Sequence, residues 1–93
     1  MTSWLIIDQD HLCYVINVNQ ITAIAAFKEQ DYYKVIIWTV DKFTAKVKLK
    51  DKEQVTALLM SLESQIGYIY IKNGEVNPWN GILGESKLEE GEE

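Results

Sequence analysis

The sequence predicts an α+β fold: an antiparallel five-stranded meander, as an open sheet or a half-barrel, packed by one amphipathic helix and followed by a small C-terminal β-hairpin. Two observations predict it. Short runs rich in Val, Ile and aromatic residues, separated by polar turns, fill residues 4–50, and a single helical pattern follows them. Strands that precede a helix, instead of alternating with helices, are typical of α+β domains.

Five strands are expected in this first part of the chain, each bounded by polar residues. The turns lie at residues 8–11, 19–20, 28–31 and 41–42, the last being a two-residue connection. The strands span residues 4–7, 12–18, 21–27, 32–40 and 43–50. Because the connections are short, successive strands are expected to pair antiparallel.

The strand at residues 32–40 is apolar on both faces. One face consists of Tyr32, Ile36, Trp38 and Val40 and is expected to lie on the helix, whereas the other consists of Tyr33, Val35, Ile37 and Thr39. Residues 43–50 alternate instead, so that Phe43, Ala45, Val47 and Leu49 are expected to be buried and the lysines between them exposed. Since one helix covers one face, the second apolar face needs other cover: another layer of strands, the C-terminal segment or another copy of the protein.

Residues 52–66 have the pattern of one amphipathic helix. Its apolar stripe consists of Val55, Leu58, Leu59, Leu62 and Ile66. Asp51 is a suitable N-cap, Gln54 completes a variant of the capping box, and Gly67 stands where a C-cap residue is expected.

A short hairpin is expected after the helix. Residues 68–71 form its first strand, Asn73-Gly74 is a strong two-residue turn signal, and Pro78 ends the return strand. Residues 1–79 are therefore predicted to form a single α+β domain. Residues 80–93, rich in Gly, Glu and Ser, are predicted to be a flexible acidic C-terminal tail.

Composition and charge exclude several classes of protein. A chain of 93 residues fits one small domain, and no apolar run reaches the roughly 18 residues that span a bilayer. With one cysteine there is no internal disulfide, so a cytoplasmic protein is expected. All nine basic residues are lysines, which counts against a sequence-specific nucleic-acid reader. Of the net charge of -5, residues 85–93 hold five glutamates and one lysine, or -4.

Candidate catalytic and metal-binding residues are few. His11 is the only histidine and Cys13 the only cysteine, and a dyad of such close neighbours on one strand leaves little room for a substrate. Asp8 and Asp10 join them in a cluster that matches neither a calcium loop nor zinc-ligand spacing. We therefore expect a protein that is not an enzyme and uses no metal or cofactor.

Residues 15–24 read Val-Ile-Asn-Val-Asn-Gln-Ile-Thr-Ala-Ile, with an Asn-X-X-Ile corner between two strands. Together with the later strands and the helix, this layout over residues 12–66 resembles the small FlbD-like flagellar proteins and other bacterial β-meander-plus-helix modules. The resemblance implies the architecture and assigns no functional residue. A half-barrel closed by the helix would resemble a pleckstrin-homology-like arrangement.

The function expected is a small non-catalytic protein–protein interaction module, or a subunit of a larger assembly, that associates with itself through an apolar sheet face. The partner is then a second copy, as in a homodimer, or another protein. Tyrosine and tryptophan dominate interface hot spots, so the candidate partner-binding residues are apolar or aromatic. They are Tyr33, Val35, Ile37, Trp38, Tyr68, Tyr70 and Trp79.

The alternative function is the binding of an anion or of a nucleic-acid backbone by a lysine strip on the strand 43–50. Its candidate residues are Lys42, Lys46, Lys48 and Lys50, and the acidic tail would gate it by competing for the strip. Lysines on an exposed strand can also simply prevent edge-to-edge pairing. No aromatic residue alternates with the lysines on that strand, so nucleic acid is the less expected ligand.

Overall fold

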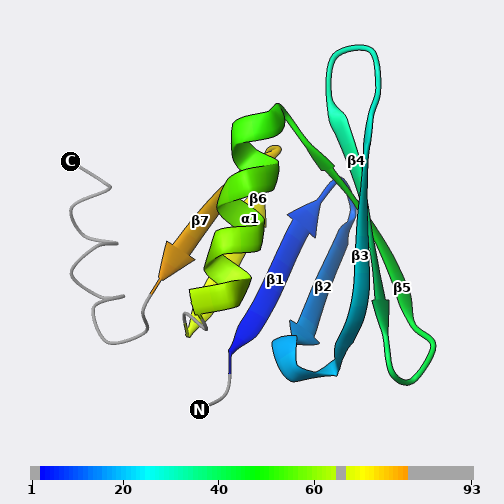
Figure 1. Cartoon of the computed structure of the whole chain (residues 1–93), viewed down its shortest axis with the longest axis vertical. Helices are drawn as coiled ribbons and strands as arrows, with labels where there is room; N and C mark the ends of the chain where they lie inside the picture. Colours follow the sequence, from blue (N-terminus) through cyan, green and yellow to red (C-terminus); the bar gives the residue numbers. More distant parts are fainter. Residues whose placement is uncertain (1–2, 65–66, 80–93) are drawn as a thin grey trace.

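A computed structural model describes residues 3–64 and 67–79 as two β-sheets and one α-helix (Figure 1). In chain order the elements are β1 (Trp4–Gln9), β2 (Leu12–Asn17), the 3₁₀ turn η1 (Val18–Gln20), β3 (Ile21–Lys28), β4 (Tyr33–Thr39), β5 (Thr44–Leu49), α1 (Lys52–Ser64), β6 (Tyr68–Lys72) and β7 (Glu75–Trp79). One sheet has the order β2-β1-β6-β7 and the other the order β3-β4-β5. The α+β class is therefore confirmed.

The predicted five-stranded meander is wrong in one respect, because it is divided between the two sheets. β1 pairs with β2, and β3, β4 and β5 pair in succession, all antiparallel as expected. Between β2 and β3 the chain turns a corner through η1, where the side chain of Asn17 accepts a hydrogen bond from the Asn19 N–H at 2.9 Å. The corner sends β3 into a separate sheet, and neither sheet closes into a barrel.

The C-terminal hairpin extends the first sheet instead of standing apart. β6 lies parallel to β1, with Trp4 opposite Tyr68 and Ile7 opposite Ile71, and β7 pairs antiparallel with β6. A parallel neighbour requires a long return connection. α1 provides it, since its 13 residues span about 20 Å and bring the chain back to the start of β1.

Polar contacts join β5 to the first sheet at one end of the molecule. The Gln9 side chain accepts a hydrogen bond from the Lys48 N–H at 2.9 Å and donates one to the Lys46 carbonyl at 3.4 Å. The Lys50 N–H donates to the Gly74 carbonyl at 2.9 Å. Backbone groups on the free edge of β5 are thus partly occupied.

The core lies where the inner faces of both sheets meet α1, which packs on β4, β5, β6 and β7 (Figure 1). Its fully buried side chains come from nearly every element and include Leu5, Ile7, Val35, Ile37, Leu49, Leu58, Ile69 and Ile71. The helix buries Val55 and Leu58, but Leu59 is 47% exposed and does not belong to the buried stripe. Ile66 lies outside the described residues.

The N-terminus of α1 is capped as predicted, but Gln54 has a different role. The Asp51 carboxylate accepts the Gln54 N–H at 3.1 Å. The Gln54 side chain accepts the Val76 N–H from β7 at 2.7 Å, so this residue ties the helix to the end of the first sheet.

The predicted orientation of β4 is reversed. Val35 and Ile37 are fully buried and Thr39 nearly so, while Trp38 is 37% exposed and Val40 57% exposed. A two-residue connection at 41–42 would have paired Val40 with Phe43, but the structure pairs Trp38 with Thr44. The loop is therefore one residue longer, and a shift of one residue moves every side chain to the other face.

Candidate binding surface

The outward side of the three-stranded sheet is a surface with a distinct composition. Its residues, given by the strand register, are Ala23, Ala25 and Phe27 on β3, Lys34, Ile36 and Trp38 on β4, and Thr44, Lys46 and Lys48 on β5. None of them is buried, and none is acidic. We call this surface the lysine face.

The lysine face combines two aromatic rings with three lysine side chains, and Tyr32 lies just before β4. Phe27 is 46% exposed and Trp38 37% exposed. The Lys34 ammonium lies 5.8 Å from the centre of the Phe27 ring, and the Lys48 ammonium lies 5.2 Å from the centre of the Tyr32 ring. Such contacts hold a cation beside a flat apolar surface.

The lysine face shares two residues with the strip predicted from one strand. Lys46 and Lys48 belong to it as expected, but the Lys50 ammonium forms an ion pair with Glu75 at 2.6 Å, and the pKa of Lys50 is raised by this hydrogen bond and by the Glu75 charge. Lys42 lies in the β4–β5 loop with a positive φ of 71°. Lys34 takes their place, because the β4–β5 register sets it opposite Lys48.

The positive surface ends near β5's C-terminal end. There a hollow of about 370 Å³ is lined by the carboxylates of Asp8, Asp10 and Asp31 together with Lys48 and Lys50. The positive charge of the lysine face is therefore concentrated at Lys34, Lys46 and Lys48.

The predicted partner-binding residues are spread over three places. Tyr33, Val35 and Ile37 belong to the inner face of β4, where Val35 and Ile37 are fully buried and offer no free surface, and Tyr33 packs against the core and is partly buried. Trp38 lies on the lysine face. Tyr68 and Tyr70 lie on the outward side of the four-stranded sheet, and the backbone of Trp79 pairs with that of Tyr68.

The outward side of the four-stranded sheet forms a second apolar surface. Its register sets Trp4 beside Tyr68 and Ile6 between Val15 and Tyr70. Val15 is 60% exposed and Tyr68 41% exposed. Charged residues of this side stand only near its end, at Asp8, Lys72 and Glu75.

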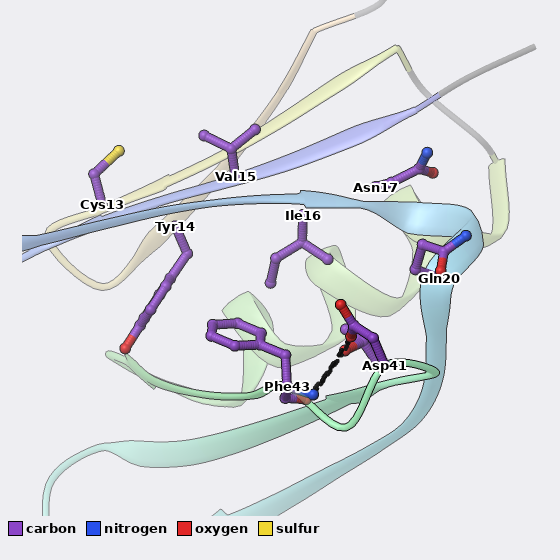
Figure 2. Close-up of a pocket in the computed structure, with 9 residues that line it drawn as sticks. Cys13, Tyr14, Val15, Ile16, Asn17, Gln20, Asp41 and Phe43 are labelled. Atoms are coloured by element: carbon purple, nitrogen blue, oxygen red, sulfur yellow. Dashed lines mark hydrogen bonds between the residues drawn. The ribbon is translucent and has the colours of Figure 1, made fainter.

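A groove of about 330 Å³ lies between β2 and the β4–β5 loop (Figure 2). Figure 2 shows Tyr14 and Ile16 pointing from β2 into the groove and Cys13 and Val15 pointing away from it. The Tyr14 and Phe43 rings meet edge to face with their centres 5.3 Å apart. The Asp41 carboxylate at the groove already accepts hydrogen bonds from the Thr39 hydroxyl and the Phe43 N–H, and these bonds lower its pKa.

His11 and Cys13 are both exposed at the β1–β2 hairpin. Within residues 3–64 and 67–79, no group of three His, Cys, Asp or Glu side chains is placed to hold a metal ion. The one helix found in these residues is too short to cross a membrane.

The chain matches no family model, no curated protein and no solved structure. Sequence reasoning missed Phe27, Lys34 and Ile36 as surface partners of Lys46 and Lys48, because they lie on other strands. The strand register would have brought them together, since directly opposed residues of antiparallel strands share a face.

Proposed function

We propose that this chain is a non-catalytic binding module whose lysine face binds an acidic, partly apolar segment of a partner protein. The observation that carries the proposal is the composition of that face: three lysines, two exposed aromatic rings and no acidic residue, on a chain of net charge -5. The segregation of positive charge favours a ligand of negative charge.

The apolar residues of the lysine face favour a protein ligand over a simple anion. Trp38 and Phe27 are large rings that a partner could cover, and tryptophan is prominent among the residues that contribute most to binding. The lysines would lie at the rim of such a contact, where charges mainly set partner choice and association rate.

Fluorescence anisotropy with defined probes tests this proposal. The probes are a labelled peptide that mixes glutamate with leucine and a labelled oligothymidylate. We expect the peptide to bind and the double variant Lys46→Glu/Lys48→Glu to weaken it by about tenfold or more, equivalent to about 1.4 kcal/mol. Trp38→Ala should weaken it to a similar extent.

The matched control is Lys52→Glu/Lys72→Glu, which makes the same change of charge at exposed lysines away from the lysine face. It should leave the affinity for the peptide within about twofold of wild type, since distant exposed charges are screened. Equal loss in both double variants, or no peptide binding at all, would contradict the proposal.

Single-stranded nucleic acid is the second candidate ligand, and one observation favours it. The register places Phe27 and Trp38 on the same face as Lys34, Lys46 and Lys48, whereas β5 alone has no aromatic residue. Exposed rings that stack bases beside cations that meet phosphates are the usual elements of such sites. Binding of the oligothymidylate but not the peptide, with the same dependence on Lys46 and Lys48, would select this function.

A further inference from the structure

β3 is an edge strand whose bulge lies at its start, between Ile21 and Ala23, and whose residues 23–27 carry no charge, proline or bulge. It reads Ile-Thr-Ala-Ile-Ala-Ala-Phe-Lys, and in the described part of the chain no strand pairs with its side away from β4. The edge of β5 is occupied by Gln9 and Gly74, and β7 contains Pro78. Natural edge strands are normally blunted by charges, proline, bulges or cover, so the uninterrupted apolar edge at residues 23–27 favours a partner strand.

The ladder geometry identifies the free backbone groups of β3. The Lys48 N–H leaves β5 on the side away from β4, because it bonds to Gln9. Backbone groups alternate sides along antiparallel strands, so the same alternation carried through β4 turns the N–H and C=O of Ile24 and Ala26 away from β4. These groups stand ready to bond a further strand.

We propose that two copies of this chain pair antiparallel through β3, about a two-fold axis at Ala25. The inference goes beyond the proposed function and does not depend on it. This register sets Ile24 opposite Ala26 of the second copy and Phe27 opposite Ala23 of the second copy, so a large side chain meets a small one on both faces. The second copy would then cover part of the exposed Phe27 ring.

The charges of β3 also fit a second copy as the occupant. Lys28 is the one charged residue of the strand and stands at its end. In this register it faces Thr22 of the second copy, so the two lysines stay apart. The pairing is isologous, which is the commonest symmetry of protein dimers, and it would join the two lysine faces into one surface.

Disulfide cross-linking tests the register. In a Cys13→Ser background, which removes the exposed native thiol, Ala25→Cys puts the two new cysteines directly opposite each other at the axis. A non-hydrogen-bonded pair has Cα atoms about 4.5 Å apart, which a disulfide can bridge. The matched variant is Ala23→Cys, whose two cysteines would be about 13 Å apart along the strand, too far to bridge.

We expect Ala25→Cys to form a covalent dimer under mild oxidation at least tenfold faster than Ala23→Cys. Sedimentation velocity should show a wild-type dimer that Ala26→Lys dissociates, while Val15→Lys, which also introduces a lysine at an exposed strand position, on β2, does not. Both lysine variants should stay folded, with the wild-type far-ultraviolet circular dichroism spectrum, while Ala26→Lys loses the stabilisation that association gives to the wild type.

A wild-type monomer at the highest soluble concentration would overturn the inference, as would equal cross-linking of the two cysteine variants or dissociation by Val15→Lys alone. None of these measurements uses a ligand. A monomer that still binds the acidic peptide would refute the dimer only, and a dimer that binds neither probe would refute the proposed function only.

Discussion

Thr39 and Asp41 determine the shape of the loop between β4 and β5. The Thr39 hydroxyl donates to the Asp41 carboxylate and accepts the Phe43 N–H at 3.1 Å. The Lys42 N–H donates to the Thr39 carbonyl at 3.0 Å, and Lys42 takes the left-handed conformation, which is the geometry of a three-residue hairpin loop. These two side chains therefore support the loop length that sets the lysine face outward.

Replacing Thr39 by valine should raise the pKa of Asp41 towards its usual value. In the folded protein that pKa is lowered, first by the hydrogen bond from Thr39 and then by that from Phe43. A lowered pKa contributes stability above the unfolded-state value of about 3.9, and this contribution is lost as the pH falls through the folded value. Thr39→Val should reduce this acid-dependent loss and lower the free energy of unfolding near neutral pH.

NMR titration of the Asp41 carboxyl and urea unfolding at several pH values measure these effects. Thr44→Val, the same change at an exposed position of β5, is the control and should alter neither. An unchanged Asp41 titration in Thr39→Val would show that the hydroxyl does not hold the carboxylate.

At the scale of elements, two of the hairpin loops, β6–β7 and β4–β5, show what a sequence can and cannot specify. Asn73-Gly74 predicted a two-residue turn, and both residues have positive φ, 56° and 77°. The other loop contains no glycine, and its left-handed residue is Lys42, for which the sequence gives no signal. The loop at 41–42 was therefore predicted one residue short, and that single residue reversed the buried and exposed faces of β4.

Gly74→Ala should destabilise the fold by about 1 to 2 kcal/mol, because a side chain is disfavoured at this φ. An added Cβ would also lie 3.2 Å from the Lys50 nitrogen, whose N–H bonds to the Gly74 carbonyl. Urea unfolding measures the loss. Asn73→Gly keeps the turn conformation and is the control; equal stability of the two variants would mean that the turn does not limit the packing of β5 on the first sheet.

At the scale of the whole molecule, local patterns predicted each strand but not the partner of each strand. The structure pairs β1 with β2 along one edge and with β6 along the other. The predicted meander placed β1 at an edge of the sheet, because it paired each strand only with its neighbours in the sequence. The parallel partner comes from 64 residues away in the chain, beyond the reach of turn signals, through the return path of α1.

The acidic residues 85–93 carry -4 on the same chain as the lysine face, so they should compete with an acidic ligand for it. A tethered competitor acts at an effective concentration of about a millimolar. Deleting residues 85–93 should raise the affinity for the glutamate–leucine peptide several-fold at low ionic strength, and the gain should shrink as salt screens the charges. Anisotropy titrations over a range of salt concentrations measure this gain in affinity.

A full-length variant with the five glutamates replaced by glutamine should gain as much affinity as the deletion, because charge and not chain length drives the competition. A deletion that binds the peptide no better than wild type at low salt would show that the tail leaves the lysine face open.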